Sequence, residues 1–421
     1  MGISVVLATN HESRKAGLKL NSTSHWLVTV SDNVIGSEAS CDWLRSAALF
    51  RGVLEMPGKP RIKTSKRRQN QLKYARKHRR KTDEGEEKGN PTYKTMATKL
   101  VIIDTDCGID DAQAIMMALA APNIQILGVT CVFGNAAVEN VCQNVLRVLS
   151  VCEREGIPVF RGCGGPLVGD SNSSSDHFGG DGLGDVITDK DPQWEEKLQR
   201  EHAVNAMIRL VSENQNQVSL VALGPLTNLA LAVRLDPSFP QKLKHLFIMG
   251  GNMEGKGNLT LCAEFNFALD PESAHIVLED FLCPTHIASW EYSCRNALTW
   301  EFFEELMNQD APAARFMKTI TSKCWAYSKE AMKTKRDVYF RPGFVSYDAY
   351  AMAACIDGSV VTESIECPVR VELQGSMCRG MMALDRTNKL KKSHSVFVMS
   401  KCDVAKFSQL LMESLRQPCN K

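Results

Sequence analysis

The chain has 421 residues, of which 44% are hydrophobic and 23% are charged, and its formal net charge is +2. These values are ordinary for a soluble globular protein, and the length suits one large α/β domain or two smaller ones. No apolar run reaches the length of a membrane span, and the apolar stretch at residues 3–8 is too short for a secretory signal. The sequence therefore argues against a membrane protein, and we expect a cytoplasmic location.

The fifteen cysteines are scattered along the chain and form no CxxC pair or other metal-ligand spacing. Cys131, Cys142 and Cys355 stand in apolar segments, where a thiol behaves as a small hydrophobic group. We therefore expect buried, reduced thiols, which are typical of a reducing compartment.

The first 95 residues differ in charge from the rest of the chain. They carry 19 Lys and Arg against nine Asp and Glu, whereas the remainder carries 31 against 39. The tract 59–81 is strongly basic, and blocks of like charge repel one another and bury little surface. We predict a disordered basic extension over residues 1–95 and a folded domain over 96–421. Two other interpretations stay open: the tract directs nuclear import or contacts nucleic acid, or translation starts at Met96.

From residue 99 onward, apolar runs alternate with segments of helical spacing. The runs predict strands at 100–103, 126–132, 218–223, 246–249 and 286–289. The longer segments predict helices at 112–120, 138–151 and 227–235. Asp270 followed by Pro271 predicts a further helix start. This alternation predicts an α/β fold with an open, mostly parallel (mixed) sheet and helices on both faces.

Four carboxylates crowd into residues 104–111, the acidic motif, directly after the first predicted strand. A structural turn explains one or two of them, and a phosphate-accepting aspartate of the DxD type does not need the pair Asp110 and Asp111. A hard cation held by carboxylate oxygens uses the most residues, since Ca²⁺ takes six to eight oxygen ligands. On that interpretation Asp106 and Asp111 bind metal, Asp110 faces a substrate, and Asp104 supports the loop.

Further polar residues follow the other predicted strands, where ligands bind in open α/β sheets. Asn135 follows the second strand, and the segment 224–228 follows the strand at 218–223. Asn258 and the segment 263–266 come after the strand at 246–249, and amide and carboxylate groups beside an aromatic ring suit a polyhydroxylated substrate. If that segment is extended, Glu264 and Asn266 point one way and Phe265 the other. Asp348 either caps a helix or supplies a distant metal ligand.

These motifs together resemble the inosine–uridine-preferring nucleoside hydrolase family. The motifs that carry the resemblance are Asp104–Ala112, Gly134-Asn135, Gly224–Asn228, Ala263–Asn266 and, near the C-terminus, Cys378-Arg379-Gly380. The resemblance extends from about residue 99 to the C-terminal helix. It implies a nucleoside hydrolase-like fold and a bound Ca²⁺ whose water cleaves the N-glycosidic bond of ribonucleosides.

The resemblance also implies roles for individual residues. Asp106, Asp111, Asp348 and the backbone carbonyl of Leu223 match the calcium ligands, and Asp106 matches the general base. Residues that match the substrate-binding positions, or lie beside them, are Asp110, Asn135, Asn258, Glu264, Phe265 and Asn266. Ribose and a free base are the implied products, an oxocarbenium-like sugar is the implied transition state, and no organic cofactor is required.

Two positions depart from the family pattern on the side of the leaving base. Tyr347 stands where many members have a histidine before the last metal ligand, and Phe178 stands where they have a second one. Tyr347 is the candidate leaving-group acid, although an ordinary phenol, with a pKa near 10, is weak for that task. The alternative is stacking of the base on an aromatic residue, with Trp290, Trp325 and Phe265 as candidates.

We therefore predict hydrolysis of purine or pyrimidine ribonucleosides to ribose and free base. The alternative is a non-catalytic protein that binds or senses nucleosides and retains the metal and ribose site. The resemblance further implies a homodimer or homotetramer. No membrane partner is expected, and nucleic acid is a partner only if the basic segment is functional.

Overall fold

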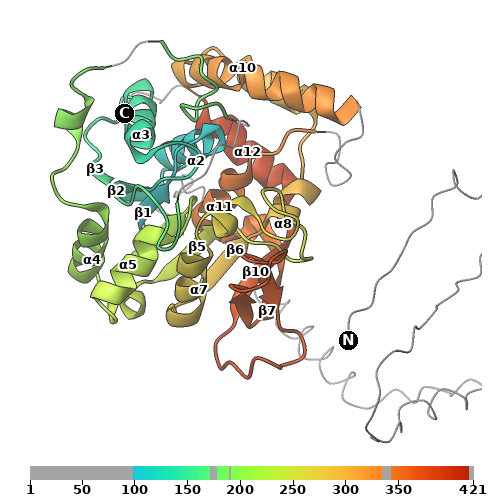
Figure 1. The fold of residues 1–421 in the computed structure, drawn as a ribbon. Coiled ribbons are helices and arrows are strands. Elements are labelled where there is room, and N and C mark those ends of the chain that lie inside the picture. Colours follow the sequence, from blue (N-terminus) through green and yellow to red (C-terminus); the bar gives the residue numbers. More distant parts are fainter. Residues whose placement is uncertain (1–97, 171–177, 189–190, 334–342, 417–421) are drawn as a thin grey trace, which may run out of the picture. The chain divides into compact units, whose positions relative to one another are not determined.

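The computed structural model describes residues 98–170, 178–188, 191–333 and 343–416 (Figure 1), and of residues 327–333 it describes the backbone alone. The predictions made for residues 1–95, including the basic tract 59–81 and the domain boundary before Met96, lie outside the described residues. Within the described residues, no helix combines the length and the apolar character that a membrane crossing requires.

One large sheet organises the described chain. Its eight strands lie in the order β3-β2-β1-β4-β5-β6-β10-β7, and only the pairing of β10 with β7 is antiparallel. The strands are β1 Lys99–Thr105, β2 Ile124–Cys131, β3 Val159–Arg161, β4 Val218–Ala222, β5 His245–Met249, β6 Thr285–Ala288, β7 Val361–Cys367 and β10 Val396–Cys402. A separate antiparallel pair consists of β8 Val369–Val371 and β9 Met382–Leu384. The predicted mixed, mostly parallel sheet is confirmed.

Helices cover both faces of this sheet, as Figure 1 shows for α4, α5 and α7 on one side and α2, α3 and α12 on the other. The α-helices are α2 Ile109–Ala120, α3 Val138–Val151, α4 Ala203–Glu213, α5 Thr227–Leu235, α6 Phe265–Leu269, α7 Pro271–Asp280, α8 Trp290–Arg295, α9 Trp300–Met307, α10 Pro312–Lys333, α11 Tyr347–Ile356 and α12 Val404–Ser414. Short 3₁₀ turns occupy Trp194–Lys197, Phe239–Lys242 and Gly358–Val360.

The core explains why β1 carries a nearly unbroken apolar run. Val101 and Ile103 pack into the cluster under α2, α3 and α11, whereas Ile102 packs into the cluster under α4, α5 and α7. Alternate side chains of a strand point to opposite faces, so a strand covered on both faces must be apolar at each position. Each fully buried side chain of this size stabilises the fold by about 1.5–3 kcal/mol.

The position of β1 in the sheet determines where a ligand can bind. The chain continues from β1 to β2 on one side, and later returns to place β4 on the other side. Such a reversal of strand order leaves a crevice beyond the carboxyl ends of the two flanking strands. The acidic motif follows β1, and Leu223 follows β4, so both meet at this crevice.

Local sequence signals explain several helix starts, and one condition considered for the sequence is not met. Asp270 caps α7 by accepting the backbone N–H of Ser273, with Pro271 in the first turn, as predicted. The segment around Glu264 is not extended, because Glu264 is the N-cap of α6 and accepts the backbone N–H groups of Asn266 and Phe267. The expected alternation of side chains along 264–266 is therefore absent.

Candidate active site

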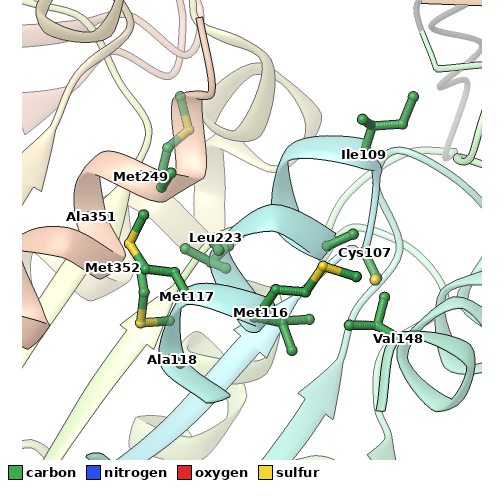
Figure 2. Packing of buried hydrophobic residues seen from close by; sticks show 14 of the residues in the cluster. Cys107, Ile109, Met116, Met117, Ala118, Val148, Leu223, Met249, Ala351 and Met352 are labelled. Carbon is green, nitrogen blue, oxygen red and sulfur yellow. The ribbon is translucent and has the colours of Figure 1, made fainter. Parts of the chain in front are cut away.

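The acidic motif is anchored by the apolar residues that alternate with its aspartates. Cys107 and Ile109 are almost fully buried in the core cluster, which also contains Leu223 and Met249 from the ends of neighbouring strands (Figure 2). The thiol of Cys107 is unpaired and buried, as expected for the cysteines in apolar segments. This packing holds the backbone of residues 106–109 in place, so that the polar side chains occupy defined positions at the strand end.

Asp111 is the most strongly anchored carboxylate of the motif. Its Oδ1 accepts the hydroxyl of Thr105 at 2.5 Å, and its Oδ2 accepts the backbone N–H of Gly108 at 2.9 Å. The side-chain amide of Asn135 donates to the same Oδ2 at 3.2 Å. The bond to Gly108 closes the first turn of α2, so the carboxylate is fixed by the helix start that it helps to form.

Asp106 lies between two glycines that give its carboxylate room. Its Oδ2 accepts the backbone N–H of Asn135 at 2.7 Å, and a Cβ added at Gly134 would overlap this oxygen. A Cβ at Gly224 would lie 2.9 Å from Oδ1. No donor among the described residues reaches Oδ1, although the atom is buried. A buried carboxylate oxygen without a partner is costly, which indicates that this atom faces a ligand.

Asp348, from the first turn of α11, joins the motif across the crevice. One oxygen from each of Asp110, Asp111 and Asp348 lies within 4.8 Å of the other two, and we call these residues the aspartate triad. Sequence reasoning placed Asp106, rather than Asp110, beside Asp111 and Asp348; the triad brings Asp110 into this group. The charges of Asp111 and Asp110 nevertheless act on Asp106, which therefore lies close by.

The electrostatics of the site favour a cation. Burial, reinforced by the charge of Asp111, raises the pKa of Asp110 to about 8. Burial and the charges of its aspartate neighbours likewise raise the pKa values of Asp106 and Asp348 well above the ordinary range. Among the described residues, the main influences on the pKa values of these three carboxylates are burial, neighbouring aspartates and hydrogen bonds, and none of them is a lysine or arginine. Several carboxylates in one buried place become stable as anions when a metal ion binds among them.

Asp104 is the member of the acidic motif that lies within β1, before the residues of the triad. Its Oδ1 accepts the Thr130 hydroxyl from β2 at 2.7 Å and the Asn228 amide from α5 at 2.8 Å. The side chain is fully buried, and burial raises its pKa to about 7. Asp104 thus ties β1 to the elements on both sides of the crevice.

The carbonyl of Leu223, the residue directly after β4, accepts a hydrogen bond from Asn266. The Asn266 Nδ2 donates to Leu223 O at 2.7 Å and to Met249 O at 3.1 Å, which joins the ends of β4 and β5. The other amide atom of Asn266, Oδ1, is buried and has no partner among the described residues. Asn266 therefore lies at the crevice. Its Nδ2 joins two strand ends, and its Oδ1 makes no hydrogen bond with the described residues.

The remaining residues predicted to bind substrate occupy different environments. Glu264 is buried, and besides its cap contacts it accepts the N–H of Gly251 at 2.8 Å, so its carboxylate organises the backbone after β5. Burial raises the pKa of Glu264 to about 7. Phe265 is half-buried in α6, whereas Asn258 is exposed on the loop between β5 and α6.

A mostly apolar pocket adjoins Asp110, and we call it the aromatic pocket. Phe178, Trp325, Phe344 and Tyr347 contribute its rings. The other lining residues are Ile109, Asp110, Gln113, Met307, Met317, Thr321, Gly343, Val345 and Ser346. Of the predicted stacking residues, Trp325 lies in this pocket, whereas Trp290 is buried in the core. His177, beside Phe178, lies outside the described residues.

Comparison with known proteins assigns the chain to a family. The sequence profile of the inosine-uridine preferring nucleoside hydrolases matches residues 101–409. The chain belongs to this family. It is 34% identical over 326 residues to the inosine-uridine preferring nucleoside hydrolase of Leishmania major, an alignment that covers 75% of this chain and 97% of the relative.

Two further relatives with similar sequence identity have other names. A probable uridine nucleosidase 1 of Oryza sativa subsp. japonica is 35% identical over 299 residues, covering 70% of this chain and 87% of the relative. A solved inosine-guanosine nucleoside hydrolase is similar with a TM-score of 0.69 and 31% identity, covering 77% of this chain and all of that one. The chain is thus a ribonucleoside hydrolase, an enzyme that acts on N-glycosyl bonds.

Within this nucleoside hydrolase, sequence reasoning missed two polar residues of the aromatic pocket, Gln113 and Ser346. Gln113 stands one helical turn after Asp110, in a helix that is otherwise apolar from Ala112 to Ala118. Residues three positions apart lie on the same face of a helix, so Gln113 lies on the face of Asp110. A single amide at such a position in an apolar run is therefore a sequence signal for the site. Ser346 carries no comparable signal, because serine is common before a helix.

Proposed function

We propose that the chain is a Ca²⁺-dependent hydrolase of purine and pyrimidine ribonucleosides that releases ribose and a free base. The observation that carries this proposal is the aspartate triad. Three buried carboxylates lie together at the crevice beside β1, and no basic side chain of the described residues is among the main influences on the pKa values of Asp110 and Asp348. A folded enzyme with this arrangement requires a cation there, and family membership supplies the substrate class.

The residues at the crevice fit calcium. Asp106, Asp111, Asp348 and the Leu223 carbonyl are the proposed ligands, and all four offer oxygen, which hard divalent cations prefer. The unpartnered Oδ1 of Asp106 supports this set, because a buried oxygen aimed at no donor suits a cation. When bound, the ion supplies positive charge that neutralises the carboxylates and acidifies water.

In the proposed reaction Asp106 is the general base. Its Oδ1 faces the proposed cation, and its Oδ2, which accepts the N–H of Asn135, keeps a second lone pair that takes a proton from the attacking water. The two flanking glycines, Gly134 and Gly224, permit the close approach that this position needs. Proton transfer strengthens the nucleophile as the glycosidic bond to the base breaks.

The ribose is proposed to bind over the aspartates. Asp110 offers a buried Oδ1 that has no partner among the described residues, and a ribose hydroxyl is a suitable donor to it. Asn135 and Asn266 bring amide groups to the same crevice, and Glu264, Phe265 and Asn258 complete the proposed substrate set. As the base departs, positive charge develops on the sugar, and the surrounding carboxylates stabilise it.

The base is proposed to occupy the aromatic pocket, with Tyr347 as the acid that protonates the leaving group. Tyr347 is the first residue of α11, directly before the triad member Asp348, and it lines this pocket. The residue therefore adjoins both halves of the site. Relatives named for inosine, guanosine and uridine lie at similar identity, which supports a proposal that covers purines and pyrimidines.

A ribose-release assay tests the proposed function. Purified protein is incubated with inosine, adenosine, guanosine, uridine and cytidine, with added calcium or with a chelator. We expect ribose from at least one nucleoside, loss of activity with chelator, and recovery when calcium is restored. Binding of nucleosides without release of ribose would instead identify a non-catalytic sensor and overturn the proposal.

A further inference from the structure

The aromatic pocket contains polar groups that the fold leaves unused. Gln113 Oε1, Ser346 Oγ and Trp325 Nε1 are buried, and none has a hydrogen-bond partner among the described residues. All three residues line the pocket, and Gln113 and Ser346 are only 1% and 2% exposed. Buried polar groups are nearly always paired in folded proteins, so three unpaired groups around one cavity indicate a polar ligand.

The orientation of the Gln113 amide is fixed by a chain of hydrogen bonds. Gln113 Nε2 lies 2.6 Å from Ser414 Oγ, and Ser414 Oγ in turn lies 2.6 Å from the backbone carbonyl of Leu411. The carbonyl can only accept, so the Ser414 hydroxyl donates to it and accepts from Gln113. Gln113 must then use its amino group toward Ser414. Its Oε1, an obligate acceptor, is the atom that remains for the pocket.

The Trp325 ring is held by other aromatic rings and offers the opposite character. Its centroid lies 4.9 Å from that of Phe344, 5.4 Å from that of Phe303 and 5.6 Å from that of Trp300. The indole N–H can only donate. The pocket therefore combines one obligate acceptor, one obligate donor and one hydroxyl that does either.

We infer that this pocket recognises the base by hydrogen bonds, with Gln113 Oε1 accepting an N–H of the base and Trp325 Nε1 donating to a ring nitrogen or carbonyl oxygen. The inference rests on the proposed function, which places the base in the aromatic pocket. A pocket of this kind favours bases that present an N–H beside an acceptor, such as the lactam group of hypoxanthine, over bases that lack this pair of groups. A site built to pair with an N–H discriminates strongly against an analogue that lacks it, since its own acceptor stays buried and unpaired.

The position of Trp325 gives the inference a spectroscopic probe. Trp325 and Tyr347 are half-buried members of the pocket wall. Because the inferred contact is made by the indole of Trp325, tryptophan fluorescence is a direct probe of occupancy.

The test compares two bases that differ in the lactam group, hypoxanthine and purine, in wild type and in Gln113→Met. Methionine keeps the length of the side chain and removes the acceptor. We expect wild type to bind hypoxanthine more tightly than purine, and the ratio of dissociation constants to fall about tenfold in the variant. Gln143→Met, the same substitution on α3, is the matched control and keeps the wild-type ratio.

A second variant keeps the inference testable if Gln113→Met does not fold. Ser414→Ala removes the acceptor that fixes the amide of Gln113 and leaves the residue itself in place. The amide is then free to turn, and we expect the preference for hypoxanthine to fall severalfold. A merely structural role for Ser414 would weaken the binding of both bases equally.

The same proteins are assayed for ribose release, which separates the two proposals. An unchanged binding ratio in Gln113→Met and Ser414→Ala, with normal hydrolysis of inosine, overturns the hydrogen-bonding role and leaves the hydrolase intact. A falling ratio in a protein that releases no ribose supports base recognition and overturns the proposed function. Wild type that binds neither base overturns the inference.

Discussion

In the acidic half of the site, hydrogen bonds from backbone or amide groups hold the carboxylates of Asp104, Asp106 and Asp111, whereas in the aromatic pocket the ring of Trp325 is held by other aromatic rings. The acidic half comes mainly from eight consecutive residues at the end of β1 and the start of α2, with Asp348 added across the crevice. The pocket is assembled from α2, α10, the start of α11 and loop residues. The difference teaches that the proposed positions of the metal and the sugar depend on one short motif, whereas the proposed fit to the base depends on segments that are distant in sequence.

Replacement of Asp106, the proposed general base, should have the largest effect on activity, and it changes the acidic half of the site alone. We expect Asp106→Asn to lower kcat for every nucleoside by about a thousandfold, because the amide cannot accept the proton. Asp191→Asn, at an exposed ion pair with Lys197, is the control. Steady-state kinetics measure the loss, and wild-type-like turnover by Asp106→Asn would contradict the role of this residue.

The glycine beside Asp106 tests the geometry without altering any charge. In Gly134→Ala the new methyl group overlaps Asp106 Oδ2, so the carboxylate must move. We expect kcat/KM to fall about a hundredfold, as a small displacement of a catalytic group commonly does. Gly165→Ala is the matched control, since a Cβ there meets nothing within 4 Å. Equal activity of the two variants would show that Asp106 tolerates displacement.

Tyr347 lies where the two halves of the site meet. A change of the substrate's leaving group distinguishes a role of Tyr347 in acid catalysis from a role in binding. We expect Tyr347→Phe to lower kcat for inosine about tenfold by loss of the phenol proton. Hydrolysis of 4-nitrophenyl riboside, whose leaving group departs without protonation, should change little. Equal losses with both substrates would assign Tyr347 to binding instead of acid catalysis.

The smallest effect is on stability, and it follows from the pKa of Asp110. That pKa is about 8 in the folded protein and 3.8 in an ordinary aspartate, so the protonated form is favoured by folding. Its stabilising contribution is complete below pH 4 and is lost as the pH rises through 8. Without divalent cations we expect Tm to fall over this range, less so in Asp110→Asn.

Saturating calcium should reverse that fall at pH 8 and raise Tm by about 5 °C, because it binds only the folded state. Differential scanning fluorimetry with calcium or chelator measures the change. A Tm that calcium does not move at pH 8 would argue against a cation site at the aspartate triad.

Much of the fold could be predicted because the periodicities are strong. The helices 138–151 and 227–235 match α3 and α5 residue for residue, and the run at 100–103 lies within β1. The cap at Asp270 was readable from two residues. The segment after Glu264 misled because its own carboxylate turns the chain into α6, a side-chain contact that outweighs alternation.

The candidate site divides in the same way. The acidic motif is contiguous, so its chemistry could be inferred from the order of its residues, and the residues of the triad were all singled out. Which aspartates lie closest together was not readable, since it depends on how α11 approaches α2. In the aromatic pocket, the amide of Gln113 is held by Ser414, a residue 301 positions later, and no local pattern connects the two.

The late position of Asp348 has a consequence for biosynthesis. Asp348 follows Asp111 by 237 residues. Strand β4, which flanks β1, begins more than a hundred residues after Asp111. Contacts so distant in sequence form slowly, after most of the chain has emerged. The repulsion between Asp348 and the other aspartates therefore arises only near the end of folding, when α11 docks. If the proposed cation binds there, we expect the supply of divalent cations at that moment to affect the yield of mature protein as well as its activity.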